Sequence, residues 1–192
     1  MPHISAFTSA LATAQADPRT AMLVALLAAA VLIDWRTYRI PNWLSVGGMA
    51  LGLLGNAAAD GITSGLLPAL AGLALGIAVL LPLYALRLMG AGDVKLMAAV
   101  GAFIGAPEIL YAVLFTFIAG GVAALAFAIY RKALRHTAAN VLDTVQFMTF
   151  AAVAGVRPQP MAGRTSIGKL PYGSCIAAGT LAWLAARHLG YA

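Results

Sequence analysis

Residues 109–130 read ILYAVLFTFIAGGVAALAFAIY and contain no charged side chain. A helix needs about 20 mostly apolar residues to cross a bilayer, and this stretch is long enough. The whole chain has the same character, since 62% of its 192 residues are hydrophobic and only 9% are charged. Soluble domains carry about 25% charged residues. The composition therefore predicts a membrane protein, and it excludes a nucleic-acid module, a disordered tail and an ordinary soluble enzyme.

Proline, glycine and acidic residues separate the apolar stretches from one another. Pro41 precedes the second stretch, Asp60-Gly61 divides the second from the third, and Pro107-Glu108 opens the fifth. We therefore expect an all-α fold, a polytopic bundle of six transmembrane helices in a single domain over residues 1–192. The expected spans lie near residues 18–34, 43–59, 66–86, 93–106, 108–130 and 171–188.

The basic residues predict the orientation of this bundle. With six spans, one set of loops holds all but two of the 12 lysines and arginines, and an excess of these residues marks cytoplasmic loops. Both termini are then outside. We expect a short external extension over 1–17 and a cytoplasmic loop over 131–170, with an interfacial helix at 141–155. The cytoplasmic set is Arg36, Arg39, Arg87, Lys95, Arg131, Lys132, Arg135, Arg157, Arg164 and Lys169.

Two of the six acidic residues differ from the rest in position. Asp34 directly follows the apolar run 21–33, and Asp93 opens the fourth expected span. The parity of the crossings brings both carboxylates to the cytoplasmic face, where an ionisable group at the edge of a span is costly and points to function. The others are interpreted as solvated loop residues or helix starts: Asp17, Asp60, Glu108 and Asp143.

Each aspartate also has a purely structural interpretation. Asp93 is a candidate N-cap after a glycine-rich loop, and Asp34 is a candidate ion-pair partner of Arg36 or Arg39. The chain has three scattered histidines and one cysteine, so no metal-ligand cluster is expected. Two carboxylates at matched depth instead favour acid–base chemistry, in which aspartates that share a proton activate a water and protonate a leaving amine.

Two segments now carry a resemblance to a known family. Gly90-Ala91-Gly92-Asp93 matches the G-x-G-D motif, and Asp34-Trp35-Arg36 with Arg39-Ile40-Pro41-Asn42 resembles the first aspartate segment of type IV prepilin peptidases. Leu170-Pro171-Tyr172-Gly173 resembles the P-Y-G segment of the smaller members, which serve Flp/Tad (tight adherence) pili. The resemblance covers roughly residues 20–188.

The resemblance implies an aspartic endopeptidase of the bacterial plasma membrane, with Asp34 and Asp93 as its catalytic pair. Such an enzyme removes the short basic leader from prepilins or pseudopilins at the cytoplasmic face, without a cofactor and without a nucleic-acid partner. It serves the assembly of a pilus or a secretion system, and it is embedded in the lipid bilayer.

Further motif positions are implied to support the site. Gly90 and Gly92 would let the backbone approach the substrate, because glycine places no Cβ in the way. Pro41, Asn42 and Lys95 match motif positions whose roles the sequence does not define. For Lys95 the ordinary interpretation is a lysine that reaches toward the lipid headgroups.

The chain departs from the larger prepilin peptidases in its cysteines. Those enzymes carry paired C-x-x-C motifs in a cytoplasmic segment associated with N-methylation of the trimmed pilin, whereas this chain has only Cys175. We interpret Cys175 as a packed small residue. We therefore expect peptidase activity without zinc and without methyltransferase activity.

Two alternatives stay open at this point, one of them another membrane protease and the other a carrier, which belongs to a different class. A protease of the presenilin or signal-peptide-peptidase type would pair G-x-G-D with Y-D and P-A-L, which Ile33-Asp34 and Leu170-Pro171-Tyr172 do not match. A proton-coupled carrier could use the two aspartates as a relay, but it would favour acids at mid-membrane and broken helices rather than acids at span ends.

Overall fold

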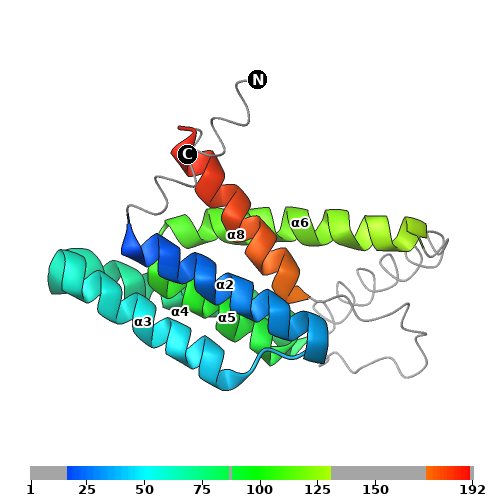
Figure 1. Ribbon diagram of the computed structural model, residues 1–192, viewed down its shortest axis with the longest axis horizontal. Coiled ribbons are helices and arrows are strands. Elements are labelled where there is room, and N and C mark those ends of the chain that lie inside the picture. The colour runs from blue at the N-terminus through cyan, green and yellow to red at the C-terminus, as the bar shows by residue number, and fades with distance from the viewer. Residues whose placement is uncertain (1–16, 87, 131–171, 191–192) are drawn as a thin grey trace, which may run out of the picture.

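The computed structural model describes residues 17–86, 88–130 and 172–190, and this part of the chain contains helices and no strand. The expected all-α fold is confirmed, and each of the six expected ranges coincides with one α-helix, with small shifts at the ends. The expected loop 131–170, its interfacial helix 141–155 and residues 1–16 of the external extension lie outside the described residues. The helices are α2 (Pro18–Thr37), α3 (Asn42–Gly61), the π-helical turn η1 (Ile62–Leu66), α4 (Leu67–Ala85), α5 (Ala91–Ile104), α6 (Glu108–Tyr130) and α8 (Tyr172–His188) (Figure 1).

Three helical segments among the described residues are long and apolar enough to cross a membrane. They are Pro18–Thr37, Asn42–Ala85 and Glu108–Tyr130. The second segment contains α3, η1 and α4, and the chain reverses within it at Gly61, whose φ of 76° suits glycine. With 14 and 17 residues, α5 and α8 are shorter than a usual span. The number of crossings and the orientation therefore stay predictions.

The short helix α5 lies at the centre of the bundle. It packs against α3 on one side and α4 on another, and its residues from Leu96 to Ala102 are buried. At 1.5 Å per residue it is only about 21 Å long. Neighbouring helices therefore cover most of this short helix.

Glycines bring α4 and α5 into backbone contact. A Cβ on Gly72 would collide with the carbonyl oxygen of Gly101, and a Cβ on Gly101 would collide with that of Gly72. Gly76 lies similarly close to the carbonyl oxygen of Met97, where a Cβ would be 2.8 Å away. These glycines therefore allow the close helix packing that small residues permit.

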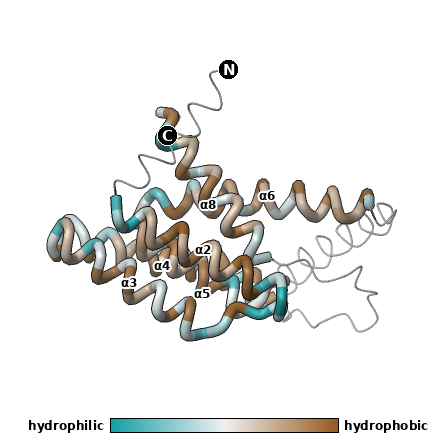
Figure 2. Tube along the Cα trace, viewed as in Figure 1, coloured by the Kyte–Doolittle hydropathy of each residue, from teal (hydrophilic) through white to brown (hydrophobic). Residues whose placement is uncertain are grey.

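The helices meet at two polar ends of the bundle. The end of α2 lies beside the starts of α3, α5 and α8, and we call this the Asp34 end. The start of α2 lies beside the ends of α3, α5 and α8 and the start of α6, and we call this the Arg19 end. Hydrophilic residues gather at both ends of α2, whereas its middle is hydrophobic (Figure 2). Helix α8 crosses α6 obliquely in this view and packs against both α6 and α2 (Figure 1).

Candidate active site

Asp34 is a buried carboxylate in the last turns of α2. Only 5% of its surface is exposed, and its Oδ2 accepts a hydrogen bond from the backbone N–H of Gly173 at 3.0 Å. Among the described residues it forms no ion pair, so the alternative of a bridge to Arg36 or Arg39 is not realised there. The helix ends just beyond it, because Tyr38 adopts the left-handed conformation and donates its N–H to the Asp34 carbonyl at 2.8 Å.

Asp93 is half-buried in the first turn of α5. The interpretation of Asp93 as the N-cap is wrong, because the helix already begins at Ala91 and the N-cap is Gly90. Asp93 is the third helical residue, and its Oδ2 accepts the N–H of Gly90 at 3.2 Å, as in a capping box. The glycine-rich loop therefore forms the start of α5, and the side chain of Asp93 bonds back to Gly90 in this loop.

The two carboxylates lie close enough for the charge of Asp34 to act on the carboxyl group of Asp93. They come from the end of one helix and the start of another, as the parity of crossings predicted. Ile40, in the short connection after α2, packs beside the starts of α5 and α8. A Cβ on Gly92 would lie 3.3 Å from the carbonyl oxygen of Ile40, and one on Gly173 would lie 3.3 Å from its Cδ1. Because Gly92 has no Cβ, its backbone packs closely against Ile40.

The supporting motif residues also gather at this end. Lys95 donates a hydrogen bond from Nζ to Oδ1 of Asn42 at 2.9 Å. Asn42 is the first residue of α3, and Pro41 is its N-cap, whose carbonyl accepts the N–H of Leu44 at 3.1 Å. The side chain of Lys95 therefore bonds to another residue of the candidate site. The interpretation of Lys95 as a lysine that reaches toward the lipid headgroups did not anticipate this bond.

The start of α8 completes the site. Tyr172 and Cys175 lie close enough to the pair for the charge of Asp93 to act on both side chains. Cys175 is 5% exposed, which confirms its interpretation as a packed residue. Trp35 donates from Nε1 to Oγ of Ser174 at 2.7 Å. The P-Y-G segment was the one sequence signal for this part of the site, and it gave no indication of these contacts.

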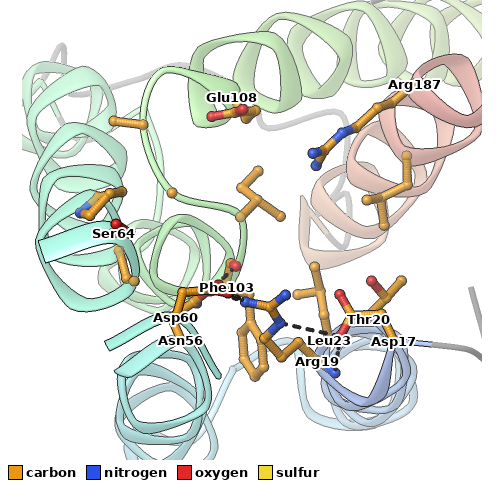
Figure 3. A pocket seen from close by; sticks show the side chains of 17 residues that line it. Asp17, Arg19, Thr20, Leu23, Asn56, Asp60, Ser64, Phe103, Glu108 and Arg187 are labelled. Carbon is orange, nitrogen blue, oxygen red and sulfur yellow. Dashed lines mark hydrogen bonds and ion pairs between the residues drawn. The ribbon is translucent and has the colours of Figure 1, made fainter. Parts of the chain in front are cut away.

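A separate cavity of about 290 Å³ lies at the Arg19 end, away from both aspartates of the pair. Arg19 and Asp60 lie at one side of it, and Glu108 and Arg187 at the opposite side (Figure 3). Glu108 is the first residue of α6, as expected. The guanidinium carbon of Arg187 lies 5.5 Å from the ring centre of Trp183.

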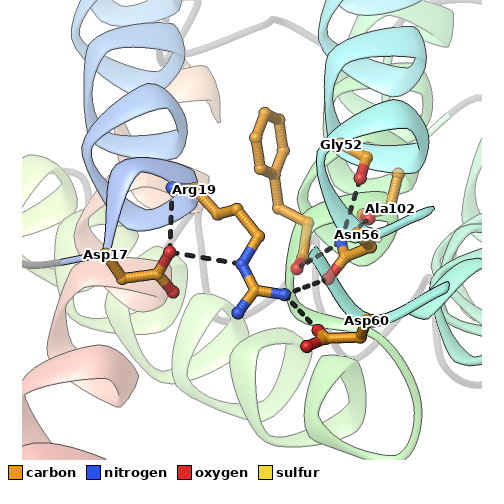
Figure 4. A network of polar contacts seen from close by, with 7 residues as sticks. Asp17, Arg19, Gly52, Asn56, Asp60 and Ala102 are labelled. Atoms are coloured by element: carbon orange, nitrogen blue, oxygen red, sulfur yellow. Dashed lines mark hydrogen bonds and ion pairs between the residues drawn. The ribbon is translucent and has the colours of Figure 1, made fainter. Parts of the chain in front are cut away.

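Arg19 joins α2 to α3 beside this cavity, and Asn56 extends the network to α5. It forms ion pairs with Asp17 and Asp60 and donates to Oδ1 of Asn56 at 3.0 Å (Figure 4). The amide of Asn56 in turn donates to the carbonyl oxygen of Ala102 at 2.9 Å. Asp17 caps α2, as a helix start should. Asp60 is exposed, as interpreted, but it lies in the last turn of α3 rather than in a loop, and it is the ion-pair partner of Arg19.

The fold and the site together define a helical membrane protein that brings two carboxylates to one end of its bundle. Residues 21–125 match the model of the type IV leader peptidase family, and the chain belongs to this family. It is therefore a protease. Asp34, Asp93 and Asn42 lie within the matched residues, whereas α8 lies beyond them. No curated protein and no solved structure matches the chain. Within the described residues, no group of three or more His, Cys, Asp or Glu side chains converges in a way that could hold a metal.

Proposed function

We propose that the protein is an aspartic endopeptidase that removes the short basic leader from prepilins or pseudopilins, with Asp34 and Asp93 as its catalytic pair. The observation that carries the proposal is the arrangement of these two carboxylates. They come from adjoining helix ends, and each has one oxygen bonded to a backbone N–H. We propose that the second oxygen of each carboxylate binds the water that attacks the substrate.

The reaction needs one carboxylate ionised and the other protonated. The ionised aspartate takes a proton from the water, whose oxygen attacks the carbonyl carbon of the scissile peptide bond, while the protonated aspartate donates its proton to the carbonyl oxygen. The tetrahedral intermediate then collapses, the C–N bond breaks, and the leaving nitrogen takes a proton from the dyad. The products are a leader with a free carboxylate and a pilin with a free amino group.

We place the Asp34 end at the cytoplasmic face of a bacterial plasma membrane. Arg36 and Arg39 are exposed beside Asp34, and Lys95 lies on the same end, as the positive-inside rule favours. We also propose that the chain acts as a peptidase of the small Flp/Tad type without methyl transfer, since its single cysteine leaves no paired C-x-x-C motifs.

Co-expression with a prepilin in a bacterial host tests the proposal. The wild-type chain should produce a mobility shift of the size of the leader, and Asp34→Asn and Asp93→Asn should each abolish it while the protein still inserts. The double variant should be no worse than either single one, because the pair acts as a unit. Glu108→Gln is the matched control, because this carboxylate lies at the Arg19 end. Near-normal cleavage by either inserted single variant would exclude the dyad.

Metal dependence supplies an independent arm of the test. A chelator should leave cleavage by the purified protein intact, since the proposed chemistry needs only the two carboxylates and a water. Activity that is lost in chelator and restored by a metal would contradict the mechanism. Methyl transfer to the trimmed pilin by this chain alone would contradict the proposed restriction to peptidase activity.

A further inference from the structure

The start of α8 is joined to the end of α2 through two consecutive residue pairs. Gly173 donates its backbone N–H to Oδ2 of Asp34 at 3.0 Å, and Trp35 donates its indole N–H to Oγ of Ser174 at 2.7 Å. The first bond is buried and the second is exposed. Adjacent residues of one helix therefore bind adjacent residues of the other, and this fixes the register between the two helices.

Gly173 has no room for a side chain. A Cβ at this position would lie 2.8 Å from Oδ2 and 3.3 Å from Cγ of Asp34. The N–H groups in the first turn of a helix have no acceptor within that helix. Because Gly173 lacks a Cβ, its N–H reaches the carboxylate directly, and Asp34 supplies the acceptor from a different helix.

This contact determines how the Asp34 carboxylate is turned. A directed bond to Oδ2 opposes rotation of the carboxylate, so the second oxygen keeps a fixed direction. Asp93 is held in the same way, but by Gly90 of its own helix. The orientation of Asp93 is therefore local to α5, whereas the orientation of Asp34 depends on where α8 begins.

We propose that Gly173 and Ser174 are positioning residues that orient Asp34 for the water it shares with Asp93. Gly173 acts directly on the carboxylate. Ser174 acts one step further away, by holding Trp35 and with it the last turns of α2. The proposal rests on the proposed function, and both residues act through Asp34 rather than on the substrate.

Steady-state kinetics with a purified prepilin in detergent test the proposal, with rates expressed per folded enzyme molecule. Gly173→Ala should lower kcat by about 10²-fold with little change in KM, since a small misplacement of a catalytic group costs this much. Ser174→Ala and Trp35→Phe should each lower kcat by about three- to tenfold, the worth of one hydrogen bond. Their double variant should lose no more than the worse single one, and Ser174→Thr, which keeps the hydroxyl, should restore most of the rate.

The control is Gly121→Ala in α6, where a Cβ would meet nothing within 4 Å. It should cleave as the wild type does. Wild-type kcat in Gly173→Ala, or Ser174→Ala and Trp35→Phe losses that multiply, would overturn the proposal, as would a rise in KM alone. If Gly173→Ala does not fold, the Ser174 and Trp35 variants decide the matter. The proposed function fails separately, when Asp34→Asn or Asp93→Asn still cleaves.

Discussion

Lys95 and Asn42 are joined by a hydrogen bond of 2.9 Å from Nζ to Oδ1, although 53 residues separate them in the sequence. The bond links the start of α3 to the first turns of α5. Ile40, two residues before Asn42, packs beside Gly92 of α5. The bond therefore holds the short connection between α2 and α3 against α5, the helix that carries Asp93.

We expect Asn42→Ala and Lys95→Ala each to slow leader cleavage by about three- to tenfold, because each removes the same exposed hydrogen bond. Since only one interaction is lost, the double variant should cleave about as fast as the slower single variant. A double-mutant cycle of cleavage rates measures this. Losses that simply multiply would show that the two side chains act independently.

Cleavage should depend on pH with a bell-shaped profile whose optimum lies between mildly acidic and neutral. Two carboxylates that share a water do not both ionise easily, so an intermediate pH range holds the singly protonated pair that the reaction needs. The two limbs describe the pair rather than either residue. Initial rates over a buffer series check this, and the bell should disappear in either Asn variant. A rate that climbs continuously into the alkaline range would point to another base.

Single reporter cysteines in a Cys175→Ala background should reveal the orientation in intact cells. Ser64→Cys, exposed in η1, should react with a membrane-impermeant maleimide from outside. Leu88→Cys, exposed after α4, should react only after the membrane is permeabilised. The reverse labelling pattern would put the Asp34 end outside the cell, on the wrong side for a cytoplasmic leader.

Arg19→Gln should lower the free energy of unfolding by about 1–2 kcal/mol, because it removes two ion pairs and leaves their carboxylates unpaired. The effect is moderate since 29% of the arginine side chain is exposed. Thermal unfolding in detergent measures it, and kcat per folded molecule should not change because this network lies at the other end of the bundle. Arg187→Gln is the control, expected to cost less than about 1 kcal/mol through its contact with Trp183. Equal losses in the two variants would contradict the bridging role of Arg19.

The sequence predicted the helices well because their limits have local causes. Charge-free length defined the ranges, and Pro107-Glu108 and Asp60-Gly61 marked ends that backbone chemistry enforces. The meeting of Asp34 and Asp93 at one end followed from the parity of crossings. The N-cap of α5 was predicted at Asp93 but lies at Gly90, three residues earlier. Glycine allows many backbone conformations, so the sequence does not show which residue of this loop begins the helix.

Contacts between distant residues could not be predicted in this way. The bond from Gly173 to Asp34 spans 139 residues, and the ion pair of Arg19 with Asp60 spans 41. A single sequence shows which residues can donate or accept, but not which of them packing will bring together. The positioning contacts of the site therefore appear only once the helices are assembled.

The burial of the middle of α5 changes what limits its sequence. Leu96, Ala98 and Ala102 have no exposed surface, and the bundle leaves no free volume beside the glycines of this helix. Helices that face lipid are constrained by polarity, whereas α5 is constrained by volume. A serine at Ala98, which can bond to a carbonyl of the preceding turn, is thus easier to accommodate than a leucine, even though leucine is the more hydrophobic residue. The middle of the helix that carries Asp93 is therefore packed like a protein interior.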